Sequence, residues 1–320
     1  MKWRWMICLF LVLMAEQSRA WGFYAHQQIN QLAVYALPQE LFPFYRSQID
    51  YLGKHAVDPD MRRYLVDGEA CRHYIDIDVF EKAIPLDTLP RRYSDAMAKF
   101  GEDSLLANGI VPWHIQWVLQ KLTKAFQENN WEKVIHISAE LGHYVADAHV
   151  PLHNTANYNG QLTGQHGIHG FFESRLPELF MPRYDLITPE AVYLEKPLEY
   201  IWDRIEQGFS ALDTVFSSEL DMRRTWVESK KTSLEERNGK LVKVWSLEYA
   251  AAWHKKLNGM VERRLHASIE GVACFWYTAW VLGGQPNLPG SVVVAEQVSE
   301  LPKEPLKTDK PGRKEDHGPE

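Results

Sequence analysis

Histidine and carboxylate residues recur at helical spacing in one stretch of the chain. His143 and Asp147 are four residues apart, so they project from the same face of a helix. A proline two residues before His153 would end that helix and turn His153 toward the same side. His169 and Glu173 form a second pair with the same spacing. Because zinc takes imidazole nitrogen and carboxylate oxygen as ligands, the stretch predicts a metal site.

One such pair would be weak evidence, because a histidine and a carboxylate four residues apart often form only a surface hydrogen bond. Here, however, all the potential ligands fall within residues 143–173, on faces that are rich in Leu, Val and Phe. An unpaired charge on such faces would be costly to bury, and a bound metal would compensate for it.

Two upstream segments offer further ligands and charged groups. His-Ala-Val-Asp-Pro-Asp at 55–60 comes shortly before two arginines, and Arg-His-Tyr-Ile-Asp follows at 72–76. Taken alone, the first segment also fits an ordinary Asp-Pro turn. Together with the downstream pairs we interpret it as a source of metal ligands. Asp58 is the first choice in that turn and Asp60 is the alternative.

The beginning of the chain has the features of a secretory signal. Basic residues precede a ten-residue apolar run at 6–15, and Ser-Arg-Ala at 18–20 fits a cleavage site. The run is shorter than the roughly 20 apolar residues of a membrane-spanning helix, so we expect no stable membrane insertion. Cleavage between Ala20 and Trp21 predicts a secreted or periplasmic protein. It would also expose an α-amine near His26, and a deprotonated α-amine can bind metal.

The rest of the sequence predicts an all-α protein. Apolar residues follow helical spacing in several segments, at 29–36, 41–49, 113–126, 131–149 and 247–282. No run of alternating strand residues and no Gly-rich phosphate loop interrupts them. About 300 residues can bury one substantial core, so we expect a single helical domain. Its predicted bounds are 21–291, after the signal at 1–20, and 292–320 has the composition of a disordered charged tail.

Charge and cysteine content narrow the classes of function. The formal net charge is −7, and the predicted signal carries more basic than acidic residues, so its removal makes the chain more acidic. A broad basic groove for nucleic acid is therefore not expected. Bound divalent metal would reverse the sign of the charge locally, so a phosphate substrate is not excluded. Cys8 would leave with the signal, and Cys71 and Cys274 allow one disulfide at most.

With these residues, the chain resembles the superfamily that joins bacterial zinc-dependent phospholipases C with the single-strand-specific nucleases of fungi and plants. The resemblance extends from Trp21 to about Asn287. Its motifs are an N-terminal Trp-Gly with a nearby His, an Asp before a His-aromatic-x-Asp segment, a His-x3-Asp-x5-His run that ends in Pro-Leu-His, and a later His-x3-Glu. The resemblance implies an all-α helical bundle of that type and a cluster of three zinc ions that hydrolyses phosphate esters.

The resemblance also assigns ligands to each of the three zinc ions. The first zinc would be bound by Asp58, His73, His143 and Asp147, the second by His153, His169 and Glu173, and the third by the amine and carbonyl of Trp21 with His26 and the shared Asp147.

Closely spaced zinc ions stabilise the charge that develops on phosphoryl oxygens and activate water for attack. Asp58 is the candidate catalytic residue, because it could act as a base or orient the water. Asp76, Arg62 and Arg63 are the candidates for substrate binding, either by contacts with the phosphate or through the ligands.

The first choice of function is a zinc-dependent phosphodiesterase of the phospholipase C type. Glu173 favours it, since the nucleases characteristically place Asp there. The close spacing of Trp21 and His26 instead resembles the nucleases, so a single-strand-specific nuclease or 3′-nucleotidase is the alternative. A non-catalytic zinc-binding helical protein is the second alternative. In either enzyme class we expect a monomer that binds a phosphate-ester substrate, either a phospholipid or a single-stranded nucleic acid.

Choline specificity is not expected of such a phospholipase. Tyr24 stands where the choline-specific phospholipases have an acidic residue, and Pro59 and Ala70 stand where aromatic residues would surround a quaternary ammonium group.

Overall fold

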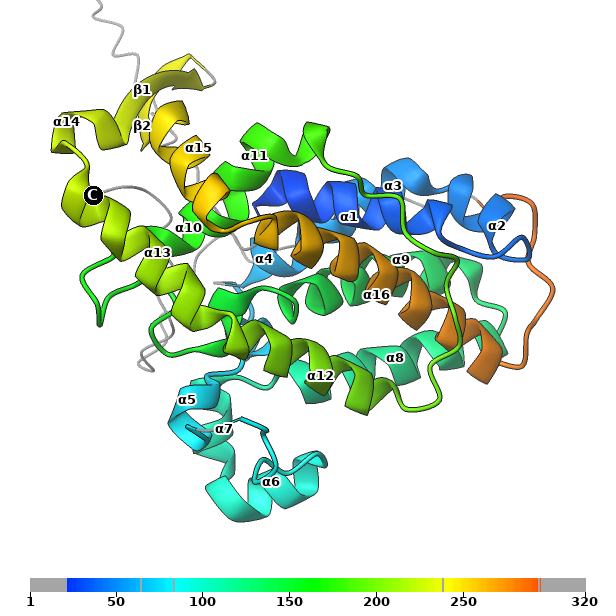
Figure 1. Cartoon of the computed structure of the whole chain (residues 1–320). Coiled ribbons are helices and arrows are strands. Elements are labelled where there is room, and N and C mark those ends of the chain that lie inside the picture. The colour runs from blue at the N-terminus through cyan, green and yellow to red at the C-terminus, as the bar shows by residue number, and fades with distance from the viewer. Residues whose placement is uncertain (1–21, 64, 83, 238, 293, 295–320) are drawn as a thin grey trace, which may run out of the picture.

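A computed structural model describes residues 22–63, 65–82, 84–237, 239–292 and 294, and within these residues the chain is mostly helical (Figure 1). This confirms the predicted all-α character. The predicted signal, Trp21 and the predicted tail apart from residues 292 and 294 lie outside the described residues. Among the described residues, no helix combines the length and the apolar character that crossing a membrane requires.

Four long helices form the centre of the molecule: α1 (Phe23–Tyr35), α8 (Val111–Gln127), α9 (Trp131–Asp147) and α16 (Met260–Leu282). α16 packs against the other three, and α9 also contacts α1 and α8. Trp276 illustrates the packing, because its ring stacks on Tyr45 at 5.0 Å and its indole N–H donates to the carbonyl of Ser138. α12 (Pro197–Ser210) packs against α8 (Figure 1).

The remaining helices connect and flank these helices. They are α2 (Phe42–Arg46), α3 (Ile49–Lys54), η1 (His55–Val57), α4 (Asp58–Arg62), η2 (Ala70–Arg72), α5 (Ile77–Phe80), α6 (Tyr93–Phe100), α7 (Glu102–Asn108), η3 (Pro151–Asn154), α10 (Ile168–Gly170), η4 (Phe171–Arg175), α11 (Leu176–Phe180), η5 (Met181–Arg183), α13 (Leu212–Thr225), α14 (Glu228–Lys231) and α15 (Leu247–Lys256).

A glycine allows α1 and α9 to approach closely. The side-chain amide of Asn30 on α1 donates to the carbonyl oxygens of Leu52 and Ala139, at 3.1 and 3.0 Å. A Cβ atom on Gly142 of α9 would lie 2.0 Å from Asn30 Oδ1, so no other residue fits there unless the hydrogen-bonded Asn30 side chain or the helices shift. This close approach matters for function, because the next residue along α9 is His143.

The structure adds one short hairpin that the sequence analysis did not predict. β1 (Thr232–Arg237) and β2 (Lys240–Trp245) pair antiparallel as a hairpin beside α14 and α15 (Figure 1). The sequence carries a signal for it, an Asn-Gly dipeptide at 238–239 between two segments with strand-forming residues. Gly239 has a φ of 76°, as the tight turn requires.

Other details also differ from the sequence-based expectations. The helix expected at 247–282 is two helices, because Asn258 and Gly259 have φ values of 48° and 74°, which an α-helix does not accommodate. Cys71 and Cys274 are both buried free thiols, so the allowed disulfide is not formed. At the start of the predicted tail, the carbonyl of Val292 accepts a hydrogen bond from Gln48.

Candidate metal centre

The C-terminal end of α9 carries the residue around which the candidate site is built. Asp147 is fully buried, and three histidines from separate parts of the chain surround it. Its Oδ2 lies 2.9 Å from His73 Nδ1 and 3.1 Å from His143 Nε2, while its Oδ1 lies 3.3 Å from His26 Nε2. The two carboxylate oxygens therefore face different histidines, which is the geometry of a carboxylate that could bridge two ions.

The imidazole of His143 is held in one orientation. Its Nδ1 donates to the carbonyl of Ala56 at 2.8 Å, so its Nε2 is directed toward Asp147 and lies 2.9 Å from His73 Nδ1. On the other side its ring stacks on the ring of His26, with centroids 4.0 Å apart. The close approach of α1 and α9 thus brings these two histidines together.

A second group of ligand-type side chains lies next to the first. His153 follows the end of α9 in η3, and its Nδ1 donates to the carbonyl of His73 at 2.8 Å. Its Nε2 lies 3.3 Å from Glu173 Oε2, and His169 Nε2 lies 3.1 Å from the same oxygen. Glu173 is in η4, a turn of π-helix, and such turns are frequent at functional sites.

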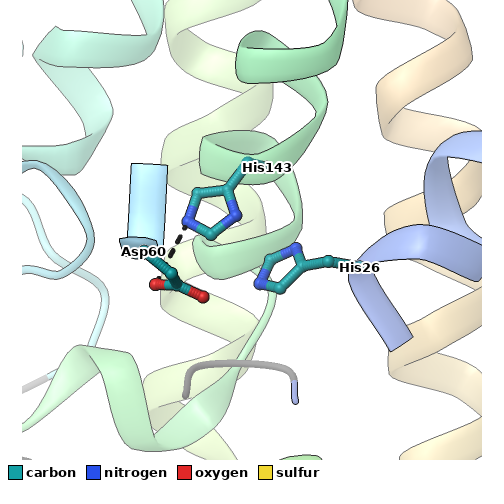
Figure 2. Close-up of side chains that lie close together, drawn as sticks. All are labelled: His26, Asp60 and His143. Carbon is teal, nitrogen blue, oxygen red and sulfur yellow. Dashed lines mark ion pairs between the residues drawn. The ribbon is translucent and has the colours of Figure 1, made fainter. Parts of the chain in front are cut away.

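The two carboxylates of the Asp-Pro-Asp turn lie in different surroundings. Asp60 Oδ1 lies 3.6 Å from both His73 Nδ1 and His143 Nε2, and Figure 2 shows the Asp60, His143 and His26 side chains pointing toward one another. Asp58 instead lies outside this group, with its carboxylate 2.7 Å from His55 Nδ1. Positions two apart on a helical turn point in nearly opposite directions, so only one of them can face the cluster.

The buried carboxylates lack the partners that burial normally demands. Both carboxylate oxygens of Asp60 are buried, and neither has a hydrogen-bond partner among the described residues. The same is true of Asp147 Oδ1. Carboxylates in the interior are costly unless a cation or hydrogen bonds compensate for them, and a bound metal would supply that charge.

Three sets of side chains have ligand atoms close enough to hold a metal ion. They are His26, Asp60 and His143; His73, His143 and Asp147; and His153, His169 and Glu173. Every member is buried. A mixture of imidazole and carboxylate donors suits zinc. Except for Asp58 and Trp21, all the predicted ligands are therefore brought together, and Asp60 takes the place of Asp58.

The electrostatic environment keeps the carboxylates ionised. Burial alone would raise the pKa of Asp147, but His143 and His153 hold this pKa well below its ordinary value. Burial likewise opposes ionisation of Glu173, and His169 and His153 lower its pKa. Burial would lower the pKa of His73, but the neighbouring carboxylates of Asp147 and Glu69 raise this pKa to about 9.

Glu69 is a functional candidate that the sequence-based analysis missed. Its carboxylate is fully buried, with Oε1 3.6 Å from His73 Nε2, the ring nitrogen that faces away from Asp147. Its Oε2 accepts from Arg62 at 3.0 Å and from Arg72 at 2.8 Å. A carboxylate behind a ligating histidine fixes the orientation of the ring. The spacing of four residues between Glu69 and His73 was the available signal.

The predicted substrate-binding residues are placed differently from one another. Arg62 forms ion pairs with Glu69 and Glu140 and donates to the hydroxyl of Tyr144, so its guanidinium belongs to a network behind the histidines. Arg63 is buried near enough to His73 to lower the pKa of that ring. Asp76 is buried and precedes α5. A role for Arg62 in orienting Glu69 fits these contacts better than direct phosphate binding.

No protein-family model and no curated protein sequence matches the chain. Its functional interpretation therefore depends on the chemistry of the side chains just described.

Proposed function

We propose that the chain is an exported zinc-dependent phosphodiesterase of the phospholipase C type, with a helical fold of the zinc-dependent phospholipase C and nuclease superfamily. The observation that carries this proposal is the convergence of buried histidines and carboxylates into three adjoining sets, with unsatisfied carboxylate oxygens in their midst. A single zinc that only stabilised the fold would need four ligands, whereas this arrangement offers more donors than one ion can use.

The proposal distributes these side chains over three zinc ions, with the first two sets divided between the first and the third ion. Asp60, His73, His143 and Asp147 would bind the first, His153, His169 and Glu173 the second, and His26 with Asp147 and the amine and carbonyl of Trp21 the third. When bound, closely spaced zinc ions stabilise charge on the phosphoryl oxygens and activate water. Asp147 is the shared ligand because its two oxygens face different histidines.

The described start of the chain supports the assignment of the Trp21 amine. A Cβ atom on Gly22 would lie 2.6 Å from the hydroxyl oxygen of Ser174, so Gly22 packs directly against the residue that follows Glu173. Trp21 precedes Gly22 in the sequence. Cleavage after Ala20 would therefore create the new α-amine one residue away from a contact with Ser174, the neighbour of the ligand Glu173.

The protein itself orients the donors before any ion binds. His143 and His153 each donate from Nδ1 to a backbone carbonyl, and this fixes the tautomer and leaves Nε2 as the donor atom toward the cluster. Glu69 is placed to orient His73 in the same way from the opposite side. Because the cluster lies in a buried environment, the charges on these ligands act with little screening by water.

A phospholipid is the proposed substrate in preference to a nucleic acid. Glu173 in the second His-x3-Glu pair resembles the phospholipases, and the acidic chain offers no evident basic stripe for a strand. The absence of an acidic residue at Tyr24 and of aromatics at Pro59 and Ala70 argues against strong choline preference.

The decisive experiment compares substrates on the mature, zinc-loaded protein. Phosphatidylcholine, phosphatidylethanolamine, single-stranded DNA, RNA and 3′-nucleotides would be assayed, with Asp147→Asn as the inactive control. We expect hydrolysis of both phospholipids with similar kcat/KM and weaker cleavage of nucleic acid. Much higher kcat/KM for single-stranded nucleic acid or 3′-nucleotides would replace the lipase proposal by the nuclease. Tightly bound zinc without any hydrolysis would favour the non-catalytic alternative.

A further inference from the structure

A second buried polar cluster begins two residues after Asp147. His149 is fully buried, and its Nδ1 donates to the carbonyl of Val145 at 2.7 Å. Its Nε2 is buried and has no hydrogen-bond partner among the described residues. Since Nδ1 carries the hydrogen, Nε2 of the neutral ring is an acceptor, and the group that satisfies it must donate a hydrogen. His149 belongs to none of the three sets of metal ligands.

Two arginines near His149, one buried and one partly buried, form no ion pair with any carboxylate of the described residues. Arg264 on α16 is only 7% exposed, and its guanidinium forms no hydrogen bond or ion pair with any described residue. Burial lowers its pKa to about 10, with Arg204 and Arg263 acting in the same direction, so it still carries its charge at neutral pH. Arg204 on α12 lies over the ring of Tyr200 at 4.5 Å, and its Nε is buried without a partner among the described residues.

His149 and Tyr200 meet at bare backbone of α16, and the charges of Arg264 and Arg204 are near enough to influence His149. Arg264 and Gly271 are seven residues apart and lie on one face of the helix. A Cβ atom on Gly271 would lie 3.3 Å from both His149 Nε2 and the hydroxyl oxygen of Tyr200. Both polar atoms therefore approach the same point beside α16. Glu270 on this helix is near enough to influence Tyr200, but it forms no ion pair with either arginine among the described residues.

We propose that His149, Tyr200, Arg204 and Arg264 form a binding site for a phosphate group that carries a proton. The guanidinium groups would donate to its charged oxygens, as arginine does in other phosphate sites. Its P–OH group would donate to His149 Nε2. Sulfate is fully deprotonated at neutral pH and has no hydrogen to donate there, so the site should discriminate against it. The four residues are distinct from the proposed zinc ligands, so this site does not depend on the proposed hydrolysis.

The test measures phosphate binding to the mature, zinc-loaded protein by isothermal titration calorimetry. Inorganic phosphate is the first probe, and Arg264→Gln is compared with the wild type. We expect Arg264→Gln to weaken one phosphate site about tenfold or more, because a charged hydrogen-bond donor is lost. Arg224→Gln is the matched control, since Arg224 is an exposed arginine on α13, and it should bind phosphate as the wild type does.

Phosphate could also bind at the metal centre, so the measurement is repeated after zinc is removed with a chelator. The proposed site should persist in the wild type and be weakened by Arg264→Gln in both forms. Loss of hydrolysis with retained phosphate binding would count against the proposed function alone. Phosphate binding that disappears entirely with zinc would overturn the site proposed here.

A second variant tests the geometry without removing charge. Gly271→Ala would place a methyl group against His149 and Tyr200, so we expect weaker phosphate binding with an unchanged net charge. Glycerol 3-phosphate, used beside inorganic phosphate, distinguishes a site for phosphate monoesters from a site for the free ion, and tight binding of either supports the proposal. Sulfate that binds as tightly as phosphate, or equal phosphate binding by the wild type and Arg264→Gln, would overturn it.

Discussion

Asp147 and His149 are separated by one residue at the end of α9, yet they face surroundings of opposite charge. Around Asp147 the side chains are carboxylates and imidazoles, and Asp60 and Asp147 have buried oxygens without hydrogen-bond partners. Around His149 they are arginines, and Arg264 has no carboxylate partner among the residues that the structure describes. Each region is incomplete in its own way. The first lacks positive charge and the second lacks negative charge.

These two regions show how unpaired charges in the interior of a protein can indicate the sign of the charge on a ligand. A buried charge without a partner costs several kcal/mol, as a broken buried pair does, so a fold that retains several of the same sign must recover this cost from something that binds. On the Asp147 side, cations would do so, and on the His149 side an anion would. The predictions that follow test the Asp147 side, in order of decreasing expected effect.

The largest effect is expected from Asp147→Asn. One carboxylate is proposed to bridge two ions, so this variant should lose two of the three zinc ions and more than about 100-fold in kcat/KM. Glu173→Gln is the matched comparison, and it should mainly weaken the second zinc. Metal analysis by mass spectrometry separates the two cases. Loss of a single ion in both variants would refute the bridging role of Asp147.

The neighbouring carboxylates of α4 should behave very differently from each other. Asp60→Asn removes a ligand that faces His73 and His143, so we expect loss of the first zinc and about a 100-fold fall in activity. Asp58→Asn disturbs a partly buried contact with His55, outside the cluster, and should change zinc content little and activity by less than about threefold. Zinc content and hydrolysis are measured together for both variants. The opposite order would restore Asp58 as the ligand.

Retention of one extra residue before Trp21 should have a smaller effect, confined to the third zinc. The extension moves the α-amine away from its proposed position, so one zinc ion is lost or bound weakly while the other two remain. We expect activity to fall about tenfold, which corresponds to roughly 1.4 kcal/mol of transition-state stabilisation. An extended protein with unchanged zinc content and turnover would exclude a role for the N-terminus.

The smallest effect on the metal centre is expected from Glu69→Gln, which should lower zinc affinity about tenfold without changing the number of ions at saturation. Burial would raise the pKa of Glu69, but His73 and Arg62 lower it below its ordinary value. The stabilisation from this carboxylate is therefore complete above its unfolded pKa of about 4.3, and it is lost as the pH falls toward the folded pKa.

Unfolding of zinc-free protein in urea at several pH values tests the direction of this pH dependence. At neutral pH the free energy of unfolding of the wild type should exceed that of Glu69→Gln by about 2 kcal/mol. This difference should narrow below about pH 4. Glu248→Gln on α15 is the surface control, and it should leave the free energy of unfolding nearly unchanged. A gap that stays constant with pH would show that the ionised form of Glu69 contributes nothing to stability.

The sequence alone determined the local structure, that is, where the main helices lie and which residues share a helical face. Helical periodicity predicted α8 and α9 to within a few residues, because the spacing of apolar residues in the sequence defines the apolar face of a helix. The same periodicity placed His143 with Asp147. The pairing of His169 with Glu173 also followed from spacing, although the turn that carries Glu173 is π-helical.

Only the tertiary structure decided which distant residues meet. The sequence could not choose between Asp58 and Asp60, because that choice depends on how α4 is rotated against α9. It could not reveal the arginines around His149, since they come from α12 and α16, which pack there through long-range contacts. Spacing along the chain determines which side chains share a face of a helix. Close packing between helices determines what that face contacts. Gly142 and Gly271 leave room in this packing for side chains of other elements.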